Sequence, residues 1–282
     1  MLEREEYIEQ AYFFGALGGR SAVNVPAQDL LDSIREELLA TTKLPLALDY
    51  LLSELKHGGA FGPAMTKLGH YFTPFQSYVI NEAEDERGRF DMRVALEMLR
   101  REAQYRAEES EPQGVFLYQF EALCRNRLRY DRGLEAMAAD PIYDEPWRTW
   151  IAGVARQVGM VDIADLIYVQ SEHYDTVQRT RGKGAGGHQD LRDNPALFGE
   201  REGRIALANR HKDPLILFAS LHRQLGYPAV PLPEPVDEAV EILPALMRRM
   251  ERLETRLKLL EEEQRGGIDL SRFYNPPGED EP

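Results

Sequence analysis

Apolar residues recur along most of the chain at steps of one, three and four, which place them on one face of an α-helix. Helix caps and breakers divide this pattern into segments: Thr73-Pro74 and Asp213-Pro214 mark helix starts, and Gly226 marks a helix end. The pattern predicts about ten helices and a mainly α fold, either a multi-helix bundle or an irregular helical array. Their expected positions are 3–17, 26–38, 43–57, 73–88, 91–99, 114–128, 145–154, 162–177 and 215–225, with a further start signal at Asp140-Pro141.

Two stretches fit a β-strand as well as a helix. Residues 166–169, Leu-Ile-Tyr-Val, form an apolar run too short for its periodicity to decide between the two. Residues 197–207 have apolar ends around a charged centre and are compatible with a small β-hairpin that pairs near Tyr168. The sequence leaves helix or strand open for residues 166–178 and 197–209.

Changes in composition divide the chain into four parts. A helical body is expected over 1–227, interrupted by a flexible glycine-rich loop at about 182–196. Four prolines within 228–235 favour an extended, semi-rigid spacer. A predicted coiled-coil stem follows at 236–265, and a flexible acidic tail at 266–282.

The predicted stem carries leucine or methionine at alternating steps of three and four. Such steps average about 3.5 residues, so the apolar stripe stays on one face only if helices wind around one another. The alternative is a single amphipathic helix that lies on its own body, because the repeat covers fewer than about three heptads. The seam consists of Leu243, Leu246, Met250, Leu253, Leu257 and Leu260.

Charges beside this seam favour a parallel assembly. Arg249 and Arg256 occupy g positions, and Glu254 and Glu261 occupy e positions. In a parallel, in-register assembly each arginine meets a glutamate of a neighbouring chain, whereas an antiparallel pair brings like charges together. The arrangement resembles a pattern of arginine, apolar residue, two-residue gap, apolar residue and glutamate that recurs in parallel three-stranded coiled coils. We therefore expect self-association as a parallel trimer, with a dimer as the alternative.

Apolar and aromatic side chains interrupt the acidic tail at Ile268, Leu270, Phe273 and Tyr274. Such residues in a polar tail can dock into a groove of a partner protein, and an oligomeric stem would present several copies at once. The alternative is that they fold back onto the stem or the body.

The formal net charge of −14 limits the kinds of partner. It opposes attraction to nucleic acid and to anionic lipid surfaces, since both depend on clustered lysine and arginine. We see neither a signal peptide nor an apolar run long enough to span a bilayer, so we expect no nucleic-acid and no membrane partner. The single cysteine, Cys124, excludes an internal disulfide framework and fits a cytoplasmic location.

Candidate metal chemistry rests on one pair of residues. Glu54 and His57 form a Glu-x-x-His pair on a predicted helix, which resembles half of the ligand set in ferritin-like di-iron bundles. Such a site needs a second pair, and the sequence has none. His57 also stands at the end of its helix, where a histidine commonly interacts with the helix dipole. The prediction is therefore no metal and no cofactor, with Glu54 and His57 as the alternative.

Three other features have structural interpretations. Cys124 lies near Phe120 on a helix face and is predicted to be a core residue rather than a nucleophile. The acidic run 82–86 is predicted to be a solvated helix end. A local basic cluster spreads over more than one helix face, which indicates solvent exposure and pairing with glutamates. It comprises Arg125, Arg127, Arg129 and Arg132.

The leading functional hypothesis is a non-enzymatic homo-oligomeric scaffold or adaptor, because the sequence offers a stem, a spacer and an apolar tail but no catalytic constellation. One alternative is a metal-dependent, oxidoreductase-like enzyme in which carboxylates and histidines of a helical bundle hold the metal. The other is a binding module whose helical groove recognises a peptide or small ligand. An exposed apolar concavity on the body would favour this last class.

Overall fold

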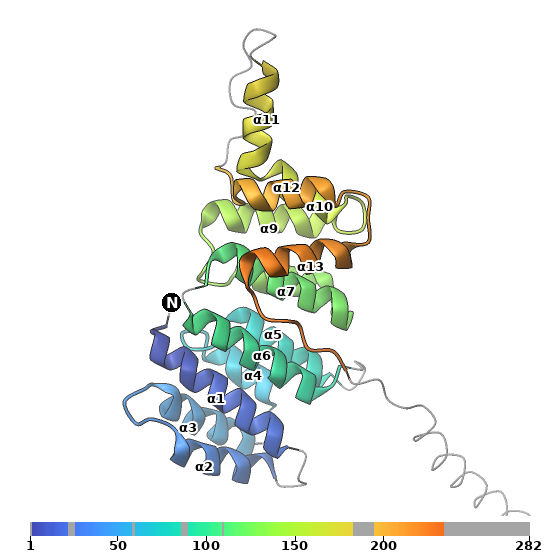
Figure 1. The fold of residues 1–282 in the computed structure, drawn as a ribbon. Coiled ribbons are helices and arrows are strands. Elements are labelled where there is room, and N and C mark those ends of the chain that lie inside the picture. Colours follow the sequence, from blue (N-terminus) through green and yellow to red (C-terminus); the bar gives the residue numbers. More distant parts are fainter. Residues whose placement is uncertain are drawn as a thin grey trace, which may run out of the picture. The chain divides into compact units, whose positions relative to one another are not determined.

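The computed structural model describes residues 2–21, 26–57, 60–85, 90–108, 110–182 and 195–233, and over these residues the protein is mainly α (Figure 1). These ranges contain thirteen α-helices and no β-strand. No helix among them is both long and apolar enough to cross a membrane. The helices are α1 (Arg4–Arg20), α2 (Ala27–Glu37), α3 (Leu44–Lys56), α4 (Phe61–Lys67), α5 (Pro74–Glu84), α6 (Met92–Ala107), α7 (Pro112–Asn126), α8 (Tyr130–Ala138), α9 (Glu145–Gln157), α10 (Ile163–Val169), α11 (Glu172–Gly182), α12 (Glu200–Ala208) and α13 (Pro214–Leu225).

The chain divides into two compact units, Met1–Leu232 and Pro233–Pro282. The predicted stem and tail belong to the second unit and lie outside the described residues. Within the first unit, α1 and α6 are the most extensively paired helices (Figure 1). They run antiparallel, because the Arg4 side chain at the start of α1 donates to the Ala107 carbonyl at the end of α6. Further pairs are α4 with α5, α8 with α9, and α10 with α12.

Hydrogen bonds at the caps confirm several predicted helix boundaries. The Thr73 hydroxyl accepts from the Gln76 N–H, and the Gln76 side chain accepts from the Thr73 N–H, which closes a capping box at α5. The carboxylates of Asp91 and Asp213 cap α6 and α13 by accepting from the N–H groups of Arg93 and Leu215. Gly226 ends α13 with a φ of 67°, a left-handed conformation that favours glycine.

The predicted β-hairpin is wrong. The stretch expected to form it is α12, and residues 166–178 divide between α10 and α11. What remains of the expected pairing is one isolated bridge between Ser171 and Phe198. The reason lies in packing: α12 buries Gly203 and Ala206, which are three residues apart and share a helix face, against its neighbours.

Two helix signals do not act as predicted. The first helix continues through Gly18 and Gly19 to Arg20, because close packing on α6 holds this end of α1. A Cβ at Gly18 would lie 3.4 Å from the Cβ of Leu96. Asp140 does not begin a helix; it is fully buried, and its carboxylate accepts from the N–H of Ile142 in the turn that follows α8. Tertiary contacts therefore replace the local capping role that the sequence indicates.

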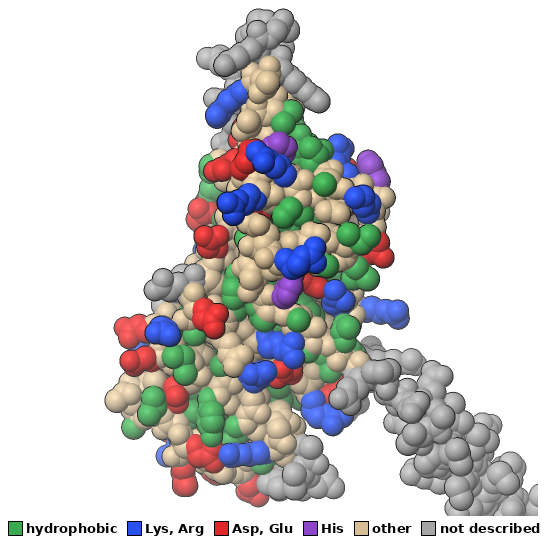
Figure 2. Space-filling model, in the orientation of Figure 1, with side chains coloured by type: hydrophobic (Ala, Val, Ile, Leu, Met, Phe, Trp, Pro, Cys, Tyr) green, Lys and Arg blue, Asp and Glu red, His purple; other side chains and the backbone are tan. Residues whose placement is uncertain are grey.

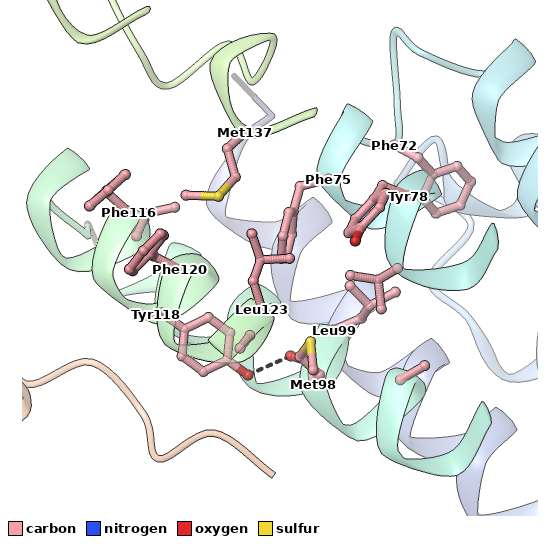
Figure 3. Packing of buried hydrophobic residues seen from close by; sticks show 14 of the residues in the cluster. Phe72, Phe75, Tyr78, Met98, Leu99, Phe116, Tyr118, Phe120, Leu123 and Met137 are labelled. Carbon is pink, nitrogen blue, oxygen red and sulfur yellow. Dashed lines mark hydrogen bonds between the residues drawn. The ribbon is translucent and has the colours of Figure 1, made fainter. Parts of the chain in front are cut away.

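Helix α7 is the centre of the first unit. Every residue from Gly114 to Leu123 is buried, and the helix contacts α6, α8 and α13. Figure 3 shows α7 side chains packed against residues of α5, α6 and α8, with the Tyr118 hydroxyl donating to the Met98 carbonyl at 2.8 Å. Phe116 and Phe120 stack one turn apart, with ring centroids separated by 5.7 Å. An aromatic layer along α7 thus packs against the neighbouring helices of the unit.

A buried charge cluster fixes α7 relative to α6 and to the turn after α8. Arg106, whose side chain is 1% exposed, donates to Glu102 at 2.8 Å and to Asp140 at 2.5 Å. The Gln119 amide of α7 donates to Glu102 at 2.7 Å and accepts from the Tyr143 hydroxyl at 3.0 Å. Burial acts to lower the pKa of Arg106, but Asp140 and Glu102 outweigh it and raise that pKa. Burial raises the pKa of Glu102, against the opposing charge of Arg106.

The first prediction concerns Arg106. Replacing it in the variant Arg106→Leu leaves two buried carboxyl groups without their cation, so we expect a loss of about 3–5 kcal/mol of unfolding free energy. Urea denaturation near neutral pH measures this loss. The matched control is Arg93→Leu on the same helix, where an exposed pair with Asp91 should contribute less than about 1 kcal/mol. Equal losses in the two variants would contradict a special role for the buried cluster.

Candidate functional site

Glu54 and His57, the alternative metal pair, have no further potential ligand side chain grouped with them among the described residues. Glu54 forms an ion pair with Lys67 at 2.6 Å, which lowers the pKa of this carboxyl. The Nδ1 atom of the exposed His57 lies 2.6 Å from the Ser53 carbonyl, one helical turn earlier. Among the described residues, no group of three potential ligand side chains includes either member of the pair. Their contacts are those of an ordinary helix end.

One group of potential ligands is present elsewhere, at the start of α10. Asp162, Asp165 and His211 bring ligand atoms within 4.8 Å of one another. The Asp162 carboxylate already accepts from the Ala164 N–H at 3.0 Å and from the His211 N–H at 2.6 Å. Asp165 pairs with Arg210. These donors satisfy the carboxylates, so the group acts as a helix cap and an ion pair that fix α10 against the end of α12.

Two carboxylates of α5 also have structural partners. Glu82 and Glu84 belong to the acidic run that is predicted to be solvated, and this prediction is wrong for Glu82, which is buried, while Glu84 is half-buried. Glu82 is buried and pairs with Arg129 at 2.7 Å. Glu84 accepts from the N–H groups of Phe61 and Gly62 at 2.7 and 2.8 Å, which caps α4. The predicted pairing of the basic cluster with glutamates is confirmed for Arg129.

An exposed apolar groove lies between α7, α8 and α13. It comprises two neighbouring hollows of about 390 and 410 Å³, which have Tyr130 and Val158 in common in their linings. We call it the α8 groove. Beside it, Met160 and Val161 are 77% and 41% exposed. Its lining comprises Phe120, Cys124, Arg129, Tyr130, Asp131, Arg132, Ala155, Val158, Gly159, Met160, Val161, Asp162, Ile163, Leu166, Lys212, Pro214 and Phe218.

Each element contributes to the α8 groove for a reason that its sequence explains. Phe120 projects from the aromatic face of α7, and its ring lies near Tyr130 and Phe218 at centroid distances of 6.3 and 6.1 Å. Gly159, with a φ of 82°, turns the chain after α9 and leaves Met160 at the surface. Figure 2 shows one face of the molecule, on which exposed apolar and basic side chains lie side by side over α12 and α13.

Cations without ion pairs border this groove. Arg132 and Lys212 are exposed, and neither pairs with an acidic side chain among the residues that the structure describes. Arg129 differs, because Glu82 and Asp85 both hold its guanidinium, at 2.7 and 3.0 Å. The lining therefore combines apolar side chains with two cations, Arg132 and Lys212, and two carboxylates, Asp131 and Asp162.

A hollow of about 530 Å³ is lined by α4 and α5 and by Arg129 and Arg132, with the carboxylates of Glu82, Glu84 and Asp85 beside these arginines. A groove of about 800 Å³ between α1 and α6 has arginines on its rim, but Arg20 is paired with Glu37 and Arg100 with Glu97. A mostly apolar hollow of about 190 Å³ lies among α1, α2, α4, α5 and α6. Its lining borders on segments outside the described residues, such as 22–25, so we assign it no ligand.

Cys124 lies in the lining of the α8 groove and is half-buried. Burial raises the pKa of its thiol to about 11, and a hydrogen bond with Tyr130 partly offsets this shift. A thiol with such a pKa stays protonated at neutral pH and is a poor nucleophile. This agrees with its predicted role as a packing residue. The sequence indicated its apolar helix face but not the groove, which is made by elements distant along the chain.

We predict slow thiol chemistry at Cys124. Only roughly a thousandth of a thiol with this pKa is ionised near pH 8, so the native chain should react with a disulfide reagent at least about 100-fold more slowly than the urea-unfolded chain. The rate should rise with pH towards 11, since the thiolate is the reacting form. Absorbance of the released thiolate measures both rates. Rapid reaction of the folded protein near pH 7 would contradict the raised pKa.

We predict a capping role for Asp162. The variant Asp162→Ala removes the acceptor for two N–H groups and should lower the unfolding free energy by about 1–2 kcal/mol. The control Asp165→Ala, which loses a surface pair with Arg210, should lose less than about 1 kcal/mol. Urea denaturation with and without a chelator measures both variants and the parent chain. Chelator-sensitive stability that both substitutions abolish would instead identify a metal site.

No protein-family model matches the chain, and neither a curated protein nor a solved structure matches it. Any assignment of function therefore rests on the residues and contacts described above.

Proposed function

We propose that the chain is a non-enzymatic homo-oligomeric scaffold that assembles through residues 236–265. The observation that carries this proposal is the heptad seam from Leu243 to Leu260 with its flanking charges. Arg249 and Arg256 at g positions and Glu254 and Glu261 at e positions favour parallel chains. The expected assembly is a trimer, with a dimer as the alternative.

The attachment of residues 226–232 to the body supports this proposal. The Tyr227 hydroxyl donates to the buried Glu121 carboxylate of α7 at 2.8 Å. Arg101 of α6 donates to the Ala229 carbonyl at 2.7 Å, and Asn126 donates to the Pro231 carbonyl at 3.3 Å. The described part of the predicted spacer is therefore held against the body. A chain segment fixed to the body at this point is consistent with a scaffold whose bodies are held by an oligomeric stem.

The chemistry of the body is also consistent with a scaffold. The buried ionisable groups described above stabilise helix ends or helix contacts, as Glu102, Glu121 and Asp140 do. A catalytic acid or base would instead face a cleft with its proton available to a substrate. We also propose that the tail residues Ile268, Leu270, Phe273 and Tyr274 dock on a protein partner. A cytoplasmic location fits a chain with one cysteine.

The solution mass of the intact chain tests the assembly. We expect about three times the monomer mass for a trimer or twice for a dimer, because the seam must be covered by other chains. A chain ending at Leu232, the limit of the first compact unit, should be a folded monomer. Light scattering after gel filtration measures both masses, and circular dichroism confirms folding. A monomeric intact chain would contradict the proposal.

Matched variants locate the interface. Leu253→Lys and Leu257→Lys place charges in the seam and should reduce the mass to that of the monomer. The control Thr255→Lys introduces the same charge at an f position, which faces away from the seam, and should leave the mass unchanged. An assembly that survives both leucine substitutions would have to use another surface.

A further inference from the structure

We infer that Glu102 is a neutral carboxylic acid in the folded protein, with its proton on Oε2, and that this proton makes the buried contact of α6 with the turn after α8 sensitive to pH. The cluster concerned consists of Glu102, Arg106 and Asp140, whose side chains are at most 1% exposed. All three belong to the first compact unit, so the inference does not depend on assembly through the stem.

The buried cluster holds two carboxyl groups but only one cation. Among the described residues, Arg106 is the only cation that forms hydrogen bonds or ion pairs with Glu102 or Asp140. If both carboxyl groups were ionised, the cluster would carry one uncompensated negative charge out of contact with water. An unpaired buried charge is costly, and such a group takes up a proton instead. One of the two carboxyl groups is therefore neutral.

Hydrogen bonds identify Asp140 as the ionised group. Its Oδ1 atom accepts from the Ile142 N–H at 3.1 Å and from Arg106 at 3.3 Å, and its Oδ2 atom accepts from Arg106 at 2.5 Å. Both oxygens thus have a donor, and an ionised acceptor forms the stronger hydrogen bonds with them. A proton on either oxygen would weaken these bonds and remove the charge that balances the guanidinium.

The two oxygens of Glu102 differ from each other. Oε1 accepts from the Nε and Nη2 atoms of Arg106 at 3.2 and 2.8 Å and from the Gln119 amide at 2.7 Å. Oε2 is buried and has no hydrogen-bond partner among the described residues. In an ionised carboxylate, Oε2 would carry part of the negative charge without any donor. A proton on Oε2 leaves an O–H group without an acceptor, which costs less than an unpaired charge.

The other ionisable groups around the cluster supply no second positive charge. Burial raises the pKa of Tyr118 on α7 and of Tyr143 well above the ordinary value, so both phenols are neutral. Tyr7 of α1 interacts with Arg106, and a phenol cannot become a cation. The pKa of Glu102 itself is raised, because burial raises it by more than the charge of Arg106 lowers it.

The proton on Glu102 links the stability of the cluster to pH. In the unfolded chain Glu102 should titrate near its ordinary pKa of 4.5, and in the folded chain at a higher pH. Between these two values unfolding releases a proton. The stability that the neutral acid contributes is therefore complete below the lower value and is lost as pH rises through the higher one. Above that pH a second negative charge stands beside Asp140 and weakens the contact between α6 and the turn after α8.

Infrared spectroscopy of the intact chain in heavy water tests the position of the proton. Near pH 7 we expect the carbonyl-stretching band of a protonated carboxylic acid, because exposed carboxyl groups are ionised at this pH. The band should disappear in the variant Glu102→Gln, whose amide has the shape of the neutral acid. It should remain in the control Glu82→Gln, because the buried Glu82 has Arg129 as its partner. Absence of the band from the parent chain, or an undiminished band in Glu102→Gln, would overturn the inference.

The pH dependence of stability provides a second test. Urea denaturation of the parent chain and of Glu102→Gln gives the two unfolding equilibrium constants from about pH 5 to about pH 8. The ratio of the parent's constant to the variant's should rise by up to about tenfold for each pH unit, since only the parent releases this proton on unfolding. A ratio that stays constant over this range would show that Glu102 is already ionised in the folded protein and would contradict the inference.

The variant Asp140→Asn separates the roles of the two carboxyl groups. It removes the ionised partner of Arg106 and should raise the unfolding equilibrium constant near pH 7 at least about tenfold. Glu102→Gln should not raise this constant, because it replaces a neutral group with another. If Glu102→Gln instead destabilised the protein more than Asp140→Asn, the proton would have to lie on Asp140.

Discussion

The ionic contact of Arg106 with Glu102 and Asp140 is the constraint on which the rest of the described unit depends. Burying these ionisable groups costs free energy, and the cost is recovered only if every partner stays in place. The cluster therefore tolerates few arrangements of α6, α7 and the turn after α8. Apolar packing alone would allow α7 to slide or rotate, whereas fixed donors and acceptors do not.

The position of α7 in turn determines what its neighbours contact. Gln119 faces the charge cluster, Glu121 holds the returning segment at Tyr227, and Phe120 lies between them in sequence and lines the α8 groove. Three successive residues of one helix thus contact three different parts of the unit.

The sequence predicts the helices well because caps and apolar spacing are local signals, as the capping box at Thr73 shows. Prediction from sequence fails where contacts between distant parts of the chain determine the local structure. Asp140 precedes a proline, as a helix cap often does, but it forms a buried ion pair with Arg106. Glu82 lies in an acidic run, but it is paired with Arg129 and buried. The hairpin expected at 197–207 is a helix because packing overrides a weak alternation. The groove has no signature in the sequence, since α7, α8 and α13 meet only in the fold.

The attachment of residues 227–231 also determines how tension would pass into the molecule. Its contacts, at the Pro231 carbonyl, the Ala229 carbonyl and the Tyr227 hydroxyl, are spaced at every second residue along an extended segment. A pull from the C-terminal side would open them one after another, starting with the contact at Pro231. The last to part is the buried contact with Glu121, so α13 is shielded from force until that anchor fails.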